Sequence, residues 1–284
     1  MIIELFGAPG AGKTTFARAL AARLRERGYT VDLILSHRPA EHSSSETLSA
    51  PAPHHRRQIL PMARRVIRPI ADMLTMVRHP LALSRDAGAV LSLIRILPPS
   101  DTLWSLRMMQ YLLRLSRAWL QATNTGHIVL FDQAFVQAVC SLALLCGATD
   151  DLLISQVLDE IPQSSLLVLL EAPINVVELR LRDRAHRASR MERLLELDLG
   201  TSLKSLSVVD SLHEALRKKG RLVMNVTSLD QHSLQQSIER IEKQITTRYN
   251  MELRAAARQS QAGSDLLRPD RSVEAPTQPL VEGH

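Results

Sequence analysis

The residues best suited to chemistry lie near the amino terminus, in the segment GAPGAGKT at positions 7–14. This segment fits the pattern GxxxxGK[ST], in which backbone N–H groups surround a phosphate and the lysine reaches the β and γ phosphates. We therefore predict that the loop binds ATP and that Lys13 also stabilises the phosphoryl group in transfer. A glycine turn with an incidental lysine is the alternative. The predicted nucleotide-binding residues are Gly7, Ala8, Pro9, Gly10, Ala11, Gly12, Lys13, Thr14 and Thr15.

A carboxylate follows another buried strand further along the chain. The apolar run 128–131 leads directly into Asp132. The carboxyl ends of parallel strands face the ligand in open α/β sheets, so we expect Asp132 to lie beside the loop. Thr14 and Asp132 are the predicted Mg²⁺ ligands, and Asp132 is also predicted to position or deprotonate an acceptor hydroxyl. Asp132 could also cap a helix that begins near Ala134, and the two roles are compatible.

Strands and helices that alternate along the chain must position these residues. Apolar runs typical of buried strands occupy residues 1–6, 31–35, 128–131, 166–170 and 221–226. Helical patterns occupy residues 13–27, 134–145, 150–160, 175–184, 191–219 and 233–249. This order predicts an α/β fold with a five-stranded parallel sheet. We expect one domain over residues 1–250, with a helical insertion at about 54–123 and an unstructured tail at 251–284.

The composition limits the classes of function. The 284 residues are 45% hydrophobic, and no apolar run reaches the ~20 residues of a membrane span. The start of the chain does not resemble a signal peptide, and Cys140 and Cys146 lie on one predicted helix where they point in different directions. We therefore expect a reduced, cytoplasmic protein. Aromatic residues make up only 3% of the chain, which argues against a nucleic-acid partner.

The segment LLVLLEAPINVVELRLRDRAHRASR at 166–190 carries the second informative pattern. A buried strand ends near Glu171 and Pro173, and the following helix carries Arg180 and Arg184. In these features the chain resembles the thymidylate kinase-like group of P-loop nucleoside and nucleotide kinases, within the P-loop NTPase superfamily. The resemblance implies a three-layer P-loop NTPase fold, and it implies that Arg180 and Arg184 are catalytic residues of a lid over the ATP phosphates. A solvated basic helix face is the alternative.

The resemblance covers residues 1–36 and 127–248, and two positions depart from the group's pattern. Gln133 follows Asp132 where the group carries arginine, and Glu171 replaces the more common aspartate. The missing arginine removes a contact to an acceptor phosphate. The sequence therefore points to an acceptor other than that of a thymidylate kinase.

Positive charge is concentrated in the middle of the chain. Residues 54–123 hold eleven arginines and three aspartates, a local net charge of +8. The resemblance implies that residues between the second and third strands form the acceptor side. The predicted acceptor-side residues there are Arg38, Arg56 and Arg57, and arginine can bind phosphate or carboxylate in bidentate fashion. Two other interpretations stay open: the arginines only keep the helices soluble, or residues 54–97 contact a membrane surface. Trp104 and Trp119 are expected to pack in the core.

Together these patterns predict a Mg²⁺- and ATP-dependent phosphotransferase, a small-molecule kinase. It would move the γ-phosphoryl group to a hydroxyl or phosphate acceptor such as a nucleoside, nucleotide or sugar. The alternative is a P-loop ATP-binding or ATPase switch protein that engages a protein partner or membrane through its basic helices. The sequence leaves the oligomeric state open, a homodimer included.

Overall fold

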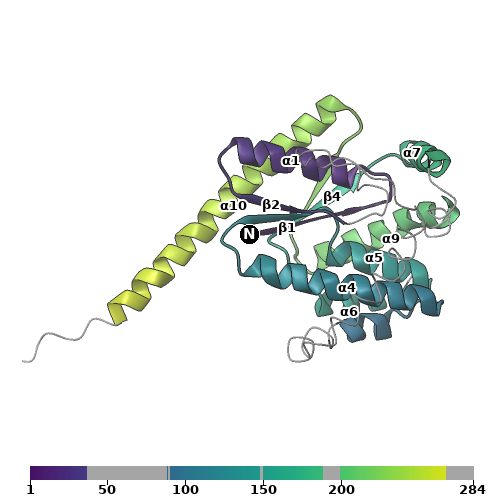
Figure 1. The fold of residues 1–284 in the computed structure, drawn as a ribbon, viewed down its shortest axis with the longest axis horizontal. Coiled ribbons are helices and arrows are strands. Elements are labelled where there is room, and N and C mark those ends of the chain that lie inside the picture. Colours follow the sequence, from purple (N-terminus) through teal and green to yellow (C-terminus); the bar gives the residue numbers. More distant parts are fainter. Residues whose placement is uncertain (37–87, 89, 148–149, 188–198, 267–284) are drawn as a thin grey trace, which may run out of the picture. The chain divides into compact units, whose positions relative to one another are not determined.

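A parallel β-sheet forms the core of the described part of the chain. The computed structural model describes residues 1–36, 88, 90–147, 150–187 and 199–266. Within these residues, five strands lie in the order β2-β3-β1-β4-β5, and every pair is parallel (Figure 1). The strands are β1 (Ile2–Gly7), β2 (Val31–Ile34), β3 (Ile128–Phe131), β4 (Leu166–Glu171) and β5 (Val223–Thr227). The predicted α/β fold with a five-stranded parallel sheet is confirmed.

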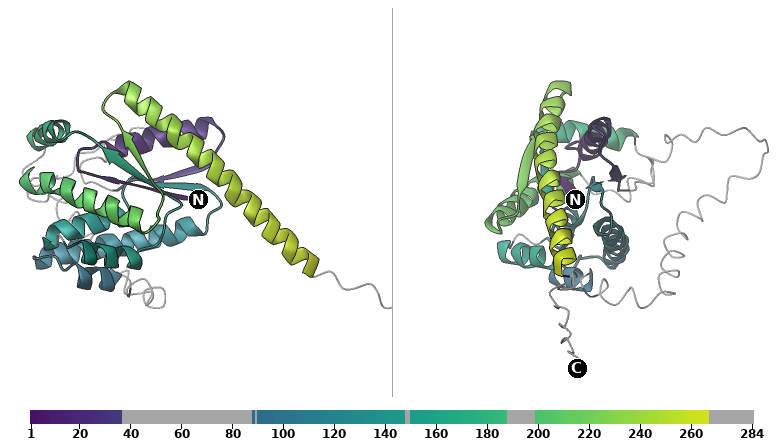
Figure 2. Two further views of the ribbon diagram at one scale, coloured as in Figure 1. Left: turned by 180° about the vertical axis from the view of Figure 1, so that it is seen from behind. Right: turned by 90° about the vertical axis from the view of Figure 1, so that its left-hand side faces the viewer.

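Helices cover both faces of this sheet and produce three layers (Figure 2). The helices are α1 (Lys13–Glu26), α4 (Thr102–Thr123), α5 (Phe135–Cys146), α6 (Asp151–Glu160), α7 (Ile174–Arg187), α9 (Leu199–Lys218) and α10 (Gln231–Leu266). On one face α1 packs on β1 and β3, and on the other α5 packs on β1 and is joined by α4, α6 and α9. Because both faces are covered, β1 and β3 are buried along their whole length.

The core divides according to the alternation of side chains along β1. Ile2 and Phe6 belong to the apolar cluster shared with α4, α5, α6 and α9. Ile3 and Leu5, which are also fully buried, point to the opposite face, where α1 lies. Glu4 therefore points into the same layer as Ile2 and Phe6. A fully buried carboxyl group in an apolar layer is energetically costly unless it is hydrogen-bonded.

The two tryptophans of α4 differ in burial, and only Trp119 belongs to the apolar core cluster. Trp119 is buried and stacks on Phe131, with ring centroids 5.4 Å apart, so its predicted place in the core is confirmed. Trp104 is half-buried, and the guanidinium of Arg107 lies 4.6 Å from the centre of its ring. Cys140 and Cys146 on α5 are both free thiols, and Cys140 is buried.

The last helix differs from its expected length. α10 continues to Leu266, whereas the sequence pattern predicts a helix end at Tyr249 and an unstructured tail from residue 251. Alanine, arginine, glutamate and glutamine are strong helix formers, so a helix can continue here on intrinsic propensity without an apolar stripe. The chain divides into two compact units, residues 1–242 and residues 243–284. No helix among the described residues is both long and apolar enough to cross a membrane.

Gly7, the last residue of β1, is a position where the fold requires glycine. Its φ is +143°, and a Cβ atom there would overlap the carbonyl oxygen of Leu170 on β4. We expect Gly7→Ala to lower the free energy of unfolding by about 3 kcal/mol or more, since backbone strain and overlap add. Gly126→Ala is the control, because nothing lies within 4 Å of its added Cβ, and it should stay within about 0.5 kcal/mol of wild type. Denaturant unfolding compares the two, and an unchanged midpoint for Gly7→Ala would contradict the close approach.

Candidate functional site

The loop between β1 and α1 has the backbone conformation of a phosphate cradle. Gly10 and Gly12 have φ values of +82° and +100°, which residues with a side chain rarely adopt. Gly12 is the residue before α1, and no side chain caps the helix there. The first N–H groups of a helix have no acceptor within it, and the helix dipole adds partial positive charge. The amino end of α1 is therefore suited to bind an anion.

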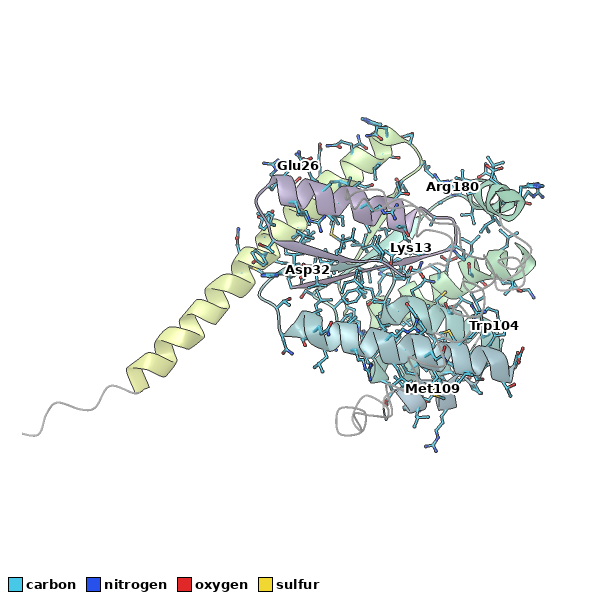
Figure 3. The ribbon with its side chains drawn as sticks, in the orientation of Figure 1. Lys13, Glu26, Asp32, Trp104, Met109 and Arg180 are labelled. Carbon is cyan, nitrogen blue, oxygen red and sulfur yellow. The ribbon has the colours of Figure 1, made fainter. Side chains whose placement is uncertain are left out.

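Lys13 is folded back over this loop. Its side chain is only 6% exposed, and its ammonium group donates hydrogen bonds to the carbonyl oxygens of Gly7, at 2.7 Å, and Ala8, at 3.0 Å. These bonds hold the charge at the mouth of the loop. Figure 3 shows Lys13 and Arg180 toward one end of the sheet, whereas Asp32 and Glu26 lie toward the other.

Asp132 lies directly after β3 and is fully buried. One carboxylate oxygen accepts the hydroxyl of Thr14 at 2.7 Å, and the other accepts the backbone N–H of Ser36 at 2.7 Å. The Ser36 hydroxyl also donates to Asp132, at 3.3 Å. The residue that caps α5 is Ala134, so Asp132 does not take the capping role that the sequence left open. Instead Asp132 links the ends of β2 and β3 to the phosphate loop.

The donor groups of Thr14 and Asp132 fit a divalent cation. A hydroxyl and a carboxylate oxygen lie 2.7 Å apart beside the loop that is suited to bind an anion. Mg²⁺ prefers oxygen donors and binds through one or two protein ligands together with phosphate and water. The two residues predicted to hold Mg²⁺ are thus brought together.

Arg180 from α7 reaches the loop from the far side. Its guanidinium donates to the carbonyl oxygens of Gly10, at 3.1 Å, and Ser228, at 3.2 Å. Ser228 lies between β5 and α10. The Arg180 side chain therefore connects the phosphate loop to the segment that joins β5 to α10. Arg180 therefore comes to the predicted site, where it is partly buried and bonds to two backbone carbonyls.

Other predicted residues are placed only in part. Arg184 lies on α7, but its side chain is outside the described part of the structure, and so are Arg38, Arg56 and Arg57. Of the predicted insertion, α4 is described, whereas residues 54–87 lie outside the described residues. Ser36 and Ser228 take part in the site without a sequence signal, because each lies just after a strand end and belongs to no motif.

A buried acid lies directly behind the phosphate loop. Glu4 is 0% exposed, and its Oε1 accepts the backbone N–H of Val136 at 2.5 Å. Burial raises the pKa of Glu4 to about 8, although hydrogen bonds from the Val136 and Gln137 backbones and the charge of Arg221 oppose the shift. Oε2 of Glu4 and the hydroxyl of Tyr111 on α4 have no hydrogen-bond partner among the described residues. Burial also raises the pKa of Tyr111, with smaller effects from the charges of Glu4 and Asp132.

The pKa of Glu4 makes stability depend on pH. Between its ordinary value of 4.5 and about 8, the folded chain keeps a proton that the unfolded chain has released. The wild-type free energy of unfolding should therefore fall as pH rises through this window, by up to about 1.4 kcal/mol per pH unit. Glu4→Gln cannot ionise and should lose this slope, whereas the exposed Glu26→Gln should keep it. Denaturant unfolding is measured between pH 4.5 and about 8 for all three proteins. If the free energy of unfolding had the same pH dependence in each, the raised pKa of Glu4 would be contradicted.

Comparison with known proteins gives structural similarity only. No protein-family model matches the sequence, and no curated protein matches it. Solved structures that are similar include deoxyadenosine kinase from M. mycoides with the products dCMP and a flexible dCDP bound, with a TM-score of 0.47 and 15% identity. The same kinase with bound dATP has a TM-score of 0.44 and 16% identity, and with bound dCTP 0.42 and 14%. Each comparison covers 87% of this chain and 100% of the other. At these TM-scores the similarity carries no argument about ligands, which must be inferred from this chain's own residues.

Proposed function

We propose that this chain is an ATP- and Mg²⁺-dependent kinase that transfers the γ-phosphoryl group of ATP to a small-molecule acceptor such as a nucleoside, nucleotide or sugar. One observation supports the proposal above the others: Thr14 in the phosphate loop is hydrogen-bonded to Asp132 after β3. This contact brings together an anion site, a pair of oxygen donors for a cation and a carboxylate that can accept a proton. Phosphoryl transfer needs all three.

The order of the strands explains why an acceptor can approach this point. The connection from β1 passes to α1 on one face of the sheet, and that from β3 passes to α5 on the other. A crevice at the carboxyl edge opens where neighbouring strands diverge in this way, and ligands of open α/β sheets bind there. Gly7 and Asp132 stand at the ends of these two neighbouring strands.

In the proposed reaction, an acceptor oxygen forms a bond to the γ phosphorus as the bond to the bridging β–γ oxygen breaks. Lys13 stabilises the negative charge on the transferring group and on the β phosphate of the departing ADP. Asp132 orients an acceptor hydroxyl and takes its proton. When bound at Thr14 and Asp132, Mg²⁺ would supply positive charge to the phosphates.

Two rearrangements are part of this proposal, because both charged groups are engaged in the structure. Lys13 exchanges at least one of its carbonyl contacts, to Gly7 or Ala8, for phosphate oxygen. The hydroxyls of Thr14 and Ser36 turn away from the buried Asp132 carboxylate to admit the acceptor. A carboxylate has about four lone-pair positions, so Asp132 can keep the Ser36 N–H while it accepts from the acceptor.

Arg180 is proposed to keep the loop in position during transfer. Its bonds to Gly10 and Ser228 fix the outer side of the cradle, and Arg184 lies one turn further along α7. Water exclusion distinguishes transfer from hydrolysis, and basic side chains that cover the phosphates contribute to it.

The test is the fate of the γ-phosphoryl group. Purified protein, Mg²⁺ and ATP labelled at the γ position are incubated with separate panels of nucleosides, nucleotides, sugars and lipid-linked sugars. Label in one acceptor class, absent from the Lys13→Ala background, supports the kinase. Label released only as inorganic phosphate in every panel, or retained in bound ATP, would overturn it in favour of an ATP-binding or ATPase switch protein.

A further inference from the structure

The amino end of α5 depends on a side chain from a distant strand. Ala134 precedes this helix and has no side chain that could accept a hydrogen bond. Glu4 of β1 supplies the acceptor instead, since the backbone N–H of Val136, the residue before Gln137, donates to its carboxyl group. Capping of this kind satisfies helix N–H groups that have no internal partner. The acid in the apolar layer is therefore tied to the first turn of α5.

That first turn also holds the phosphate loop. The side-chain Oε1 of Gln137 accepts the backbone N–H of Gly7 at 3.1 Å in a buried contact. The carbonyl of the same Gly7 accepts the ammonium of Lys13 at 2.7 Å. Gly7 is thus fixed through its N–H by α5 and through its carbonyl by Lys13. Glu4 is thus linked to Lys13 through the first turn of α5, the Gln137 side chain and the backbone of Gly7.

We propose that Glu4 is a positioning residue for the phosphate-binding loop: its carboxyl group caps α5 and thereby holds Gln137 against the Gly7 N–H. The role rests on the proposed function only in that the loop is taken to bind phosphate. In this role Glu4 and Gln137 both act through the backbone of Gly7, whose N–H the Gln137 side chain accepts.

The surroundings of Glu4 favour this role over a chance burial. A buried carboxyl group is costly, and apolar residues occupy the neighbouring inward positions Ile2 and Phe6 on the same strand. The charged or titratable groups that act on Glu4 are Arg221, which precedes β5, and Tyr111 on α4. Neither donates a hydrogen bond to Oε2, and the bonds that Glu4 does accept come from α5. The hydrogen bond to the first turn of α5 is thus the specific contact that Glu4 makes at this buried position.

The experiment compares variants that keep or remove each acceptor. Glu4→Gln keeps an oxygen that can accept the Val136 N–H. Glu4→Met has a side chain of similar size but no oxygen acceptor. Gln137→Met removes the acceptor for Gly7, and the double variant Glu4→Met with Gln137→Met closes a mutant cycle. Leu5→Ala is the matched control, because Leu5 is equally buried on the same strand but points to the other face.

The first measurement is hydrogen exchange of the Gly7 amide in nucleotide-free protein, followed in samples with isotope-labelled glycine. Loss of a buried acceptor frees the amide, so we expect exchange at least about tenfold faster in Glu4→Met and Gln137→Met. Glu4→Gln should stay near wild type. The double variant should exchange no faster than Gln137→Met alone, since Glu4 acts through Gln137.

Two results would overturn the positioning role. One is additive acceleration in the double variant, which would show that Glu4 and Gln137 act separately. The other is acceleration in Leu5→Ala equal to that in Glu4→Met, which would mean that Gly7 only reports global stability.

The second measurement is the dissociation constant for Mg-ATP, which should rise about tenfold in Glu4→Met and in the double variant but stay near wild type in Glu4→Gln. Unchanged affinity in Glu4→Met, where Gly7 exchange is accelerated, would overturn the role in ligand binding. If wild-type protein did not bind ATP, the proposed function would fail. The exchange measurement needs no nucleotide, so it would still decide whether Glu4 positions Gly7.

Discussion

Lys13→Ala is expected to lower ATP-dependent activity by about 10²-fold or more and to weaken ATP binding, because removal of one preorganised donor at a developing charge has an effect of this size. The ammonium is the buried cation that the structure places on the loop itself, bonded to Gly7 and Ala8. Its loss also leaves those two carbonyl oxygens without their donor. Turnover and equilibrium ATP binding are both measured, since the loss is expected in each.

The control for Lys13→Ala is Lys218→Ala, which removes an exposed ammonium that pairs with Glu214 on the same helix. Surface pairs of this type contribute little, so ATP binding and turnover should be unchanged. Full ATP affinity in Lys13→Ala would show that the loop does not bind phosphate through this lysine. The glycine-turn interpretation of residues 7–14 would then be preferred.

Asp132→Asn is expected to separate binding from transfer. Asparagine retains the shape of the side chain but carries no charge and is a far weaker proton acceptor, so transfer should fall by about 10²- to 10⁴-fold. Its remaining oxygen can still accept the Ser36 N–H, so the end of β2 stays in place. ATP affinity measured without acceptor should stay within about threefold of wild type, since the loop and Lys13 are unaltered.

Asp32→Asn makes the same chemical change at an exposed position of β2, where the carboxylate lies 3.6 Å from the His127 ring, and should leave transfer intact. Wild-type transfer by Asp132→Asn would remove the catalytic assignment and leave Asp132 with a structural link between strand ends. Loss of ATP binding together with transfer would place its main role in the cation site with Thr14.

The sequence could identify the loop and Asp132 because both are local signals. Residues 7–14 carry their chemistry in a contiguous pattern, and the run 128–131 is followed at once by its acid. The strands were likewise predictable, to within one or two residues at their ends, because strands buried on both faces are continuous apolar runs. The observed β3, Ile128–Phe131, matches its predicted bounds.

The supporting residues could not be predicted, because their roles depend on which strands become neighbours. Ser36 meets Asp132 only because β2 lies beside β3, and Glu4 meets α5 because β1 lies beside β3. Along the sequence, Glu4 is only an interruption in an apolar strand. Gln137 is similarly a polar residue in an apolar helix, and its bond to Gly7 depends on the same arrangement.

The order of the strands has a further consequence, for the biosynthesis of the chain. β1 pairs with β3 and β4, and β2 pairs with β3, so the first two strands to be synthesised are not partners of each other. Loop closure over more than a hundred residues must precede the pairing of β1 with β3, and contacts so distant in sequence form slowly. Until β3 has left the ribosome, β1 and β2 are apolar segments with unpaired backbone groups, and such segments are prone to aggregate. The phosphate loop is contiguous in sequence, yet a nascent chain cannot hold it against β3 and β4 before the residues of β4 have been made.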